Sequence, residues 1–326
     1  CFGHDGLWSS TIIGTATTGE WVNVGCVFDG TNIIPYFNGV AGTPIAYNGT
    51  IVNGGNLLIG NVGTFDLPFN GLIDDVRIYN RALSASEIRY QYNQGAPIAH
   101  WKMDEGSGNY AYDSSGNANT GSLALGGSAT SSAWVSGVYG GAMSFDGVDD
   151  YVDTTDINSI DGASALTVSA WVNQSSLSTA KAIISKWDYQ TQGNFVLQTD
   201  NATPGKLLLY IATSLTDTGV GCQFITTNVV LTANQWRYVS FVFDGTQTGD
   251  ANRLKMYVNG ASVAMTQSSG AVPATLTAGG TATVKIGKFG GTLGRYFNGS
   301  IDDVRIYNYA RTAEQVRADY NAGAAM

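Results

Sequence analysis

A stretch of twelve residues occurs twice in this chain of 326 residues, and this duplication constrains the fold more than any other feature. Residues 69–80 and 297–308 differ at one position, where Leu72 replaces Ser300. So long a match indicates two copies of one structural unit. Within the stretch an Asn-Gly turn signal precedes an alternating pattern, so each copy is predicted to contain a strand that leaves a tight turn.

The alternation places Asp302 on the same strand face as Val304 and Ile306. The two apolar residues mark the face that we expect to point into a core. A carboxylate on that face needs backbone N–H groups, a cation or a metal as its partner.

A short helix is predicted to follow the strand in each copy. Ser84 and Thr312 begin sequences typical of a capping box. Gly95 and Gly323 stand where these helices are expected to end.

Composition favours short strands and turns over helices, since the chain has 42 glycines, 11% aromatic residues and only 13% charged residues. The net charge of −9 argues against a nucleic-acid partner, which would need basic patches. It suits an extracellular or cation-binding protein. We find no apolar run of the eighteen or so residues that span a membrane, so no membrane span is expected.

The three cysteines are too widely spaced to predict a disulfide framework or a metal cluster. Cys26 falls inside a predicted strand, so we expect a buried free thiol there. The chain begins with Cys1 and not with Met, from which we expect that an N-terminal segment has been removed from a secreted protein.

The two copies can be aligned beyond the duplicated stretch, because residues 21–30 match 236–245 and residues 35–39 match 256–260. The first copy then occupies residues 1–95, residues 96–97 form a linker, and the second copy occupies 98–326. Trp21 and Trp236 are expected in the cores. In the second copy, strands are predicted near 166–172, 181–187, 193–199, 206–213, 221–227, 237–243, 252–258, 261–266, 282–288 and 300–307.

Many short strands separated by turns, with one helix at the end, predict an all-β fold: an antiparallel β-sandwich in two tandem copies. The order of the motifs resembles the laminin-G-like (concanavalin-A-like lectin/glucanase) jelly-roll domain. The resemblance implies one complete jelly roll over about 98–323 and the C-terminal half of another over 1–95. It is carried by the motifs at 101–108, 113–116, 145–152, 168–172, 236–243, 257–260 and 297–308.

The first copy has no counterpart of roughly residues 98–215, and half a sandwich leaves strand edges and an apolar face uncovered. One interpretation is that the sequence is part of a longer protein of several repeats. Another is that strands from a neighbouring subunit complete the first copy, as in donor-strand assembly. A lipidated Cys1 is a third possibility, but it would explain no missing strand.

Calcium is the expected metal, because similar jelly rolls hold a structural Ca²⁺ near an edge and this cation prefers oxygen ligands. On the resemblance, Asp113, Asp146 and Asp302 are candidate ligands in the second copy and Asp74 in the first. The alternative is that these aspartates accept backbone N–H bonds in turns.

Residues 187–194 are the predicted sugar-binding stretch, since an aromatic platform beside amide and carboxylate groups is typical of such sites. The candidates are Trp187, Asp188, Tyr189 and Asn194. The alternative is a hairpin loop in which Trp187 folds back over the edge of the sandwich.

Catalysis is not expected. A glycosidase needs two carboxylates across a cleft, and the four glutamates lie apart in the sequence. The two histidines, His4 and His100, lie in different copies, which argues against a catalytic triad or a histidine zinc site.

These observations predict a non-enzymatic protein of the extracellular space or cell surface that recognises a glycan or a protein. The alternative is a structural subunit of an extracellular filament or surface layer. In that case the chain would self-associate through its incomplete first domain.

Overall fold

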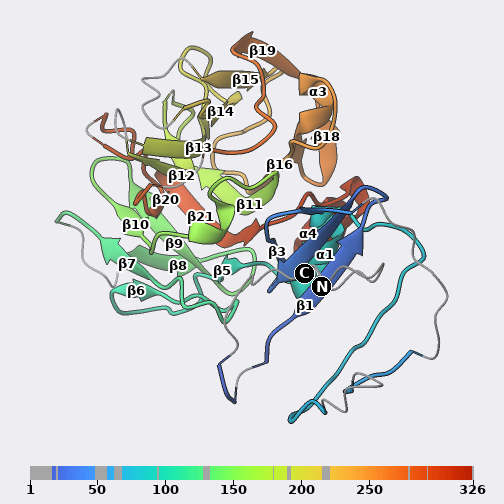
Figure 1. Cartoon of the computed structure of the whole chain (residues 1–326). Coiled ribbons are helices and arrows are strands. Elements are labelled where there is room, and N and C mark those ends of the chain that lie inside the picture. The colour runs from blue at the N-terminus through green and yellow to red at the C-terminus, as the bar shows by residue number, and fades with distance from the viewer. Residues whose placement is uncertain are drawn as a thin grey trace. The chain divides into compact units, whose positions relative to one another are not determined.

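The computed structural model has two compact units, Cys1–Gly95 and Ala96–Met326, and each is considered by itself (Figure 1). It confirms the predicted fold class, since antiparallel strands dominate and a helix closes each unit. The structure describes residues 17–19, 21–47, 57–61, 68–93, 95–127, 133–178, 180–188, 192–214, 221–277, 280–291 and 293–324.

The second unit is a sandwich of two antiparallel sheets. One sheet has nine strands in the order β19-β15-β14-β13-β12-β20-β10-β7-β6, and the other has the order β18-β17-β16-β11-β21-β9-β8 with β5 paired to β21. The strands are β5 (Ala99–Trp101), β6 (Tyr110–Ala111), β7 (Gly121–Ala124), β8 (Trp134–Ser136), β9 (Gly141–Asp146), β10 (Tyr151–Asp153), β11 (Ala165–Gln174), β12 (Ala182–Asp188), β13 (Gln192–Thr199), β14 (Leu207–Ile211), β15 (Cys222–Thr226), β16 (Arg237–Asp244), β17 (Leu254–Val258), β18 (Ala261–Val263), β19 (Met265–Ser269), β20 (Val284–Ile286) and β21 (Asn298–Tyr307).

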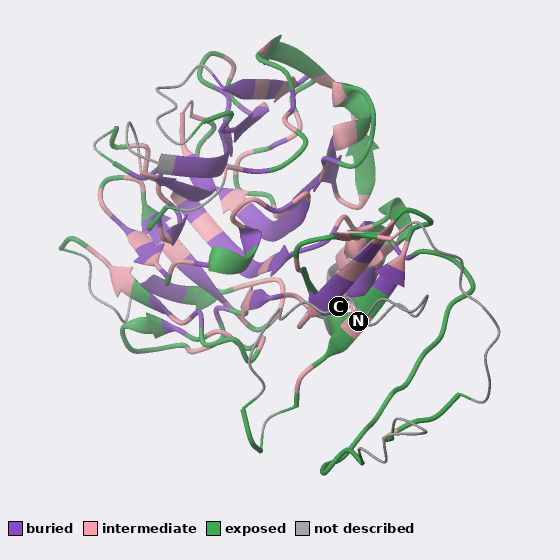
Figure 2. Cartoon of the chain, viewed as in Figure 1, coloured by how far each residue is buried: buried purple, intermediate pink, exposed green. Residues whose placement is uncertain are grey.

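The core of the second unit lies between these sheets, where alternate side chains of each strand meet. Leu166 and Val168 of β11 point into it from the eight-stranded sheet. The rings of Phe195, from the nine-stranded sheet, and Phe241, from the eight-stranded sheet, meet edge to face with centroids 5.3 Å apart. Figure 2 shows the buried residues concentrated along the strands of both sheets.

Strand β21 carries the second copy of the duplicated stretch, and a bulge changes its predicted faces. Asp303 has a φ of +50°, and the register with β11 shifts at this point. Ile301 and Val304 therefore share the main core, whereas Asp302 is paired with Trp171 on the opposite face. Asp302 is buried and bonded to backbone N–H groups, as expected, but the prediction that it shares a face with Val304 and Ile306 is wrong, because the extra residue of the bulge interrupts the alternation.

Helix α4 (Ala313–Ala324) packs on the outer face of the eight-stranded sheet. Val316 joins a buried cluster there, and the rings of Tyr320 and Trp171 lie 5.6 Å apart. The predicted capping box is confirmed: the Thr312 N–H donates to Gln315 Oε1 (2.9 Å) and the Gln315 N–H donates to Thr312 Oγ1 (3.2 Å). The unit also has the short helices η2 (Asn158–Ile160) and α3 (Asp250–Arg253).

Ion pairs connect helix α4 to the strands beneath it. Asp319 on α4 lies 2.8 Å from Arg311 and 3.5 Å from Arg305. Arg305 pairs with Asp303 at 2.9 Å, and Asp303 lies 2.6 Å from His100 Nε2. These side chains are largely buried, so removing one member would leave another charge without its partner.

The first unit contains a small sheet of β1 (Val24–Phe28), β2 (Asn32–Phe37), β3 (Val40–Ala41) and β4 (Ile45–Ala46), and the helix α1 (Ala85–Asn93). The predicted two-residue turn is present, since Asn38 and Gly39 have φ of 48° and 74° between β2 and β3. Gly95, with φ of 79°, follows α1 as expected. The core of this unit is a small cluster of Val27, Tyr36, Leu83 and Ile88.

The first copy of the duplicated stretch forms no strand and is exposed throughout residues 69–80 (Figure 2). Ile78 is 72% exposed, whereas its counterpart Ile306 is 0% exposed. The strand prediction is wrong for this copy, because no strand among the described residues of the first unit pairs with the stretch.

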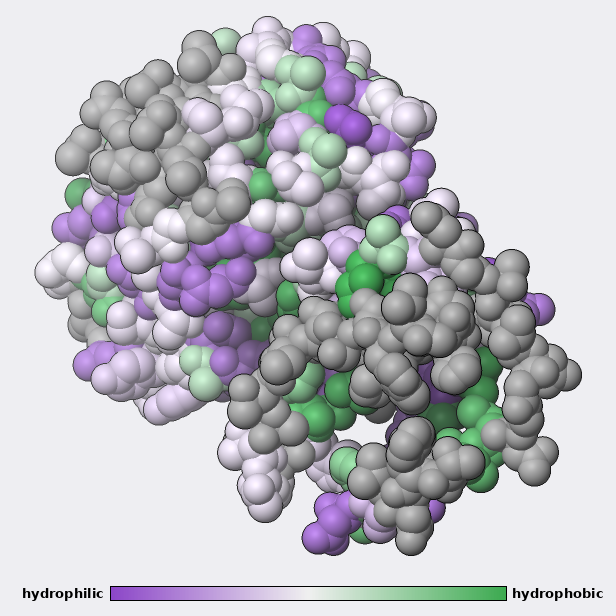
Figure 3. All heavy atoms as spheres, viewed as in Figure 1, coloured by the Kyte–Doolittle hydropathy of each residue, from purple (hydrophilic) through white to green (hydrophobic). Residues whose placement is uncertain are grey.

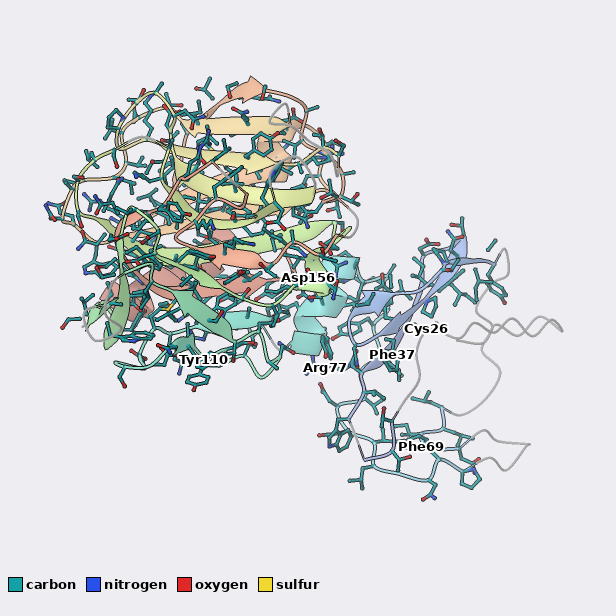
Figure 4. The ribbon with its side chains drawn as sticks, turned by 90° about the vertical axis from the view of Figure 1, so that its left-hand side faces the viewer. Cys26, Phe37, Phe69, Arg77, Tyr110 and Asp156 are labelled. Carbon is teal, nitrogen blue, oxygen red and sulfur yellow. The ribbon has the colours of Figure 1, made fainter. Side chains whose placement is uncertain are left out.

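Two side-chain expectations for the first unit are also wrong. Trp21 is 65% exposed and does not enter a core. Cys26 lies exposed on β1 (Figure 4) and is disulfide-bonded, so it is not a buried free thiol. The counterpart of Cys26 is Phe241, which the second unit buries between its two sheets, whereas the described part of the first unit has one sheet. The counterpart of Trp21 is Trp236, which is only partly buried, on the outer face of the eight-stranded sheet. The buried free cysteine is Cys222 of the second unit.

The described residues include no helix whose length and hydropathy would let it cross a membrane.

Candidate functional site

A groove lies on the face of the nine-stranded sheet that points away from the core of the second unit. The groove follows from the alternation of side chains along each strand. Phe195 and Leu209 enter the core. Their neighbours Val196, Leu208 and Tyr210 point to the other side of the sheet. These outward side chains belong to a second apolar cluster. An antiparallel sheet commonly presents a polar face to water, so an apolar cluster here is a feature to explain.

Trp187, at the end of β12, lies at the base of the groove. Its ring meets Tyr210 edge to face, with centroids 4.7 Å apart, and lies 6.2 Å from Phe289 at an interplanar angle of 29°. Gly193 makes room for the indole, since a Cβ at that position would lie 2.3 Å from the ring. Trp187 is 1% exposed, and its Nε1 has no hydrogen-bond partner among the described residues.

Polar side chains border this aromatic base. Arg295 lies over the Phe289 ring at 5.3 Å and donates to Gln198 Oε1 at 3.0 Å. Gln198 in turn donates to Asn201 Oδ1 at 2.9 Å, and Gln223 lines the groove from β15. The groove has a volume of about 260 Å³.

This arrangement suits a small polar ligand with a hydrophobic side. Amide and guanidinium groups offer several donors and acceptors for hydroxyl groups, and the apolar base can contact C–H groups. The aromatic rings are nearly buried, so they do not form an open stacking platform. None of the described lining residues is a carboxylate, and Arg295 is the charged group among them.

The structure does not support the predicted sugar site at residues 187–194. Trp187 is buried, because Phe289 and Tyr210 pack against it, so it is not an exposed platform. It belongs to strand β12 and not to a hairpin loop, so the alternative is correct only in that the ring is covered. Asn194 is also buried and is bonded to Asp161 and Thr277.

The two remaining candidates of that stretch differ in what the structure says of them. Asp188 accepts a hydrogen bond from Lys285 at 3.3 Å, so its carboxylate forms an ion pair. Tyr189 lies outside the described residues.

Sequence reasoning missed the polar residues of the groove. Gln198 and Gln223 occupy outward positions of predicted strands, so their alternation with apolar neighbours was a usable signal. Arg295 could not be found this way, because its place beside Gln198 depends on contact between residues 97 positions apart.

The proposed calcium ligands are not brought together as a set. Asp113 accepts backbone N–H bonds from His100, Ser115 and Asn119, each at 2.9 Å. Although burial acts in the opposite direction, these bonds lower the pKa of Asp113. Asp74 is exposed and accepts the N–H of its neighbour at 2.8 Å. For these two residues the alternative of backbone bonds in turns is correct.

Of the four predicted calcium ligands, Asp146 lies in a cluster of carboxylates. Among the described side chains that could share a metal ion, Asp146, Asp149 and Asp150 can place carboxylate oxygens within 4.8 Å of one another. They lie in the turn between β9 and β10, where Asp146 Oδ1 accepts the N–H of Val148 at 2.8 Å.

Asp302 lies in a different environment from that acidic turn. One carboxylate oxygen accepts the N–H groups of Val138 (2.7 Å) and Tyr139 (2.9 Å), and the other has no partner among the described residues. Burial raises the pKa of Asp302 to about 7, although the two N–H groups lower it. Its role is to hold the loop before β9 against β21.

Solved structures of low sequence identity share this fold. Domain 4 of AbnA, a GH43 extracellular arabinanase from Geobacillus stearothermophilus solved in complex with arabinotriose, is 21% identical with a TM-score of 0.51, over 68% of this chain and 97% of that domain. The receptor binding domain of botulinum neurotoxin mosaic serotype C/D is 16% identical with a TM-score of 0.50, over 70% of this chain and 51% of that one. At such identities these similarities show the fold alone.

Among curated proteins, none matches this sequence. The family model described as the concanavalin A-like lectin/glucanases superfamily, Laminin_G_3, matches residues 4–89 and 146–317. These two segments fall in the two units, and together they cover well over half of the chain. The chain therefore belongs to the concanavalin A-like lectin/glucanases superfamily.

Proposed function

We propose that this protein is a non-enzymatic extracellular binding protein whose second unit recognises a glycan in the groove above Trp187. The observation that carries the proposal is the combination of an apolar base with a rim of Arg295, Gln198, Asn201 and Gln223. Hydroxyl groups of a sugar can exchange hydrogen bonds with this rim while its C–H groups face the base.

Two further features support binding without catalysis. The described lining has no carboxylate pair, which a glycosidase of the usual mechanism requires. The jelly rolls of similar fold include a domain solved with arabinotriose and a receptor-binding domain. An extracellular location agrees with the disulfide at Cys26, since such bonds persist in oxidising compartments.

Isothermal titration of the whole chain with a panel of oligosaccharides, arabino-oligosaccharides included, tests the proposal. Asn201→Ala and Gln223→Ala should each weaken binding about fivefold, which corresponds to the ~1 kcal/mol of one hydrogen bond. Asn228→Ala is the matched control, because Asn228 is exposed and does not line the groove. Binding that neither groove variant alters, or no binding to any member of the panel, would contradict the proposal.

We further propose that the turn between β9 and β10 binds Ca²⁺. Asp146, Asp149 and Asp150 supply the oxygen donors that Ca²⁺ prefers, whereas Asp113 and Asp302 do not fit a shared site with them. A bound cation would offset the repulsion among three carboxylates and stabilise this turn. Added Ca²⁺ should therefore raise the melting temperature of the chain, and Asp149→Asn should remove most of that increase. An equal increase in the variant would exclude this turn as the site.

The filament hypothesis remains a second candidate function. It is favoured by the apolar side chains that the first unit leaves exposed, among them Leu72 at 78%. Such a surface is typical of an interface with another polypeptide.

A further inference from the structure

Lys186 of β12 lies inside the sandwich of the second unit, where lysines are rarely found. On the neighbouring strands it is paired with Phe195 and Val284, which both belong to the main core. Directly paired residues point to the same side of a sheet, so the lysine also points between the two sheets. Its side chain is 1% exposed. Figure 3 shows hydrophilic residues over the visible surface of the second unit, which is where lysines ordinarily lie.

Two carboxylates face the Lys186 ammonium group, and both come from the connection between β10 and β11. Asp156 Oδ1 lies 2.5 Å from Nζ, and Asp161 Oδ1 lies 2.9 Å from it. Asp156 is labelled in Figure 4. Ile157 and Ile160 of the same connection belong to the main core. The connection therefore holds its two carboxylates against a lysine at the edge of an apolar core.

Asp161 has an incomplete set of hydrogen bonds. Its Oδ1 accepts hydrogen bonds from Lys186 and from Asn194 Nδ2, the latter at 2.6 Å. Its Oδ2 is buried and has no partner among the described residues. The side chain as a whole is 8% exposed, so water does not readily satisfy that oxygen. Asp161 can therefore take up a proton beside the lysine.

Lys285 provides a comparison within the same sheet. Its Nζ lies 3.3 Å from Asp188 and 3.7 Å from Asp153, and these carboxylates are 35% and 38% exposed. Water stabilises separate charges in such a pair. Around Lys186 the charges are far less hydrated, and burying two charges is costly even when they are paired. A reaction that replaces the two charges by a neutral group is favoured there.

We propose that Lys186 and Asp156 form an isopeptide bond inside the folded second unit. Nζ forms a bond to Cγ of Asp156, and one Cγ–O bond breaks. The departing oxygen leaves as water with two protons of the ammonium group. The products are one neutral amide and one water molecule, so atoms and charge balance without another reagent.

The neighbouring groups supply what this reaction needs. Asp161 accepts a proton from Nζ, which frees the nitrogen lone pair for attack, and then passes the proton to the departing oxygen. The fold holds Nζ against the Asp156 carboxylate, so the reaction is intramolecular. Asp156 is 21% exposed, which gives the water a way out. The inference does not depend on glycan binding.

The bond would close a covalent ring around β11. The two linked residues are 30 positions apart, and β11 lies between them in the sequence. This strand is hydrogen-bonded to β16 on one edge and to β21 on the other. Such a cross-link restricts the unfolded chain and so stabilises the sandwich.

Mass spectrometry of the whole chain, denatured and with its disulfide reduced, tests the proposal. The wild type should be lighter than its sequence by the mass of one water molecule. Lys186→Arg keeps the positive charge but cannot form the bond, and Asp161→Asn cannot carry the proton, so both should have their full mass. Asp188→Ala is the matched control, because it removes a partner of Lys285 and should leave the loss of water unchanged.

A tryptic digest locates the bond, since ring closure of Asp161 onto the nitrogen of Gly162 would also remove one water molecule. Without the bond, Asp156 and Lys186 fall in separate peptides, 103–181 and 182–186. With the bond, trypsin cannot cleave after the modified lysine, and tandem spectra should show peptide 103–181 branched from peptide 182–206.

The proposal would be overturned by a wild-type chain of full mass. A loss of water that persists in Lys186→Arg, or that leaves peptides 103–181 and 182–186 unlinked, would overturn it as well. A branch at Asp161 in place of Asp156 would show that the assigned acceptor is wrong.

Discussion

Asp302 combines complete burial with an incomplete set of hydrogen bonds. One oxygen is held by two backbone N–H groups, and the other has no partner among the described residues. With its pKa raised to about 7 by burial, Asp302 holds a proton more readily in the folded chain than an unfolded aspartate does. The folded state therefore binds the extra proton between about pH 4 and that pKa, and this group makes stability fall as pH rises through the window.

Asp302→Asn tests this assignment. Asparagine keeps an oxygen for the two N–H groups and cannot ionise, so the variant should gain stability relative to the wild type from pH 5 to pH 8. The expected difference reaches a few kcal/mol at most, because one pKa unit corresponds to about 1.4 kcal/mol. Urea unfolding at several pH values measures it. Parallel stability profiles for the two proteins would show that Asp302 does not ionise in this range.

Trp187 shows why the site was harder to predict than the fold. Its neighbours in sequence are polar, which favoured an exposed platform, yet Phe289 covers it from 102 positions away. Gly193 then leaves room for the indole, since a Cβ there would clash with it. Only the tertiary structure brings these residues together, so no local pattern could place the tryptophan.

At the scale of elements, strands and caps were predicted well where the signal is local. The predicted strand at 193–199 and the capping box at Thr312 are confirmed. The bulge in β21 was missed because strict alternation was assumed across Asp302 and Asp303. Helix α4 runs through Gly323 to Ala324, past its predicted end, which shows that a glycine signal alone does not fix a helix boundary.

At the scale of the whole molecule, the duplication predicted two related units, and the all-β antiparallel sandwich is confirmed. The same sequence nevertheless forms a buried strand in one unit and an exposed segment in the other. The difference lies in the neighbours, because a strand needs partners for its backbone groups and a core for its side chains. Local sequence sets the positive φ that Asp75 and Asp303 share but cannot by itself make a strand.

Hydrogen–deuterium exchange of the whole chain compares the two copies directly within one molecule. Peptides covering 69–80 and 297–308 have nearly the same intrinsic exchange rates, and their single difference, Leu72 against Ser300, separates them by mass. The account predicts strong protection across 297–308, where β21 is paired and buried, and exchange near the intrinsic rate across 69–80. Equal protection of the two stretches in the chain alone would contradict it.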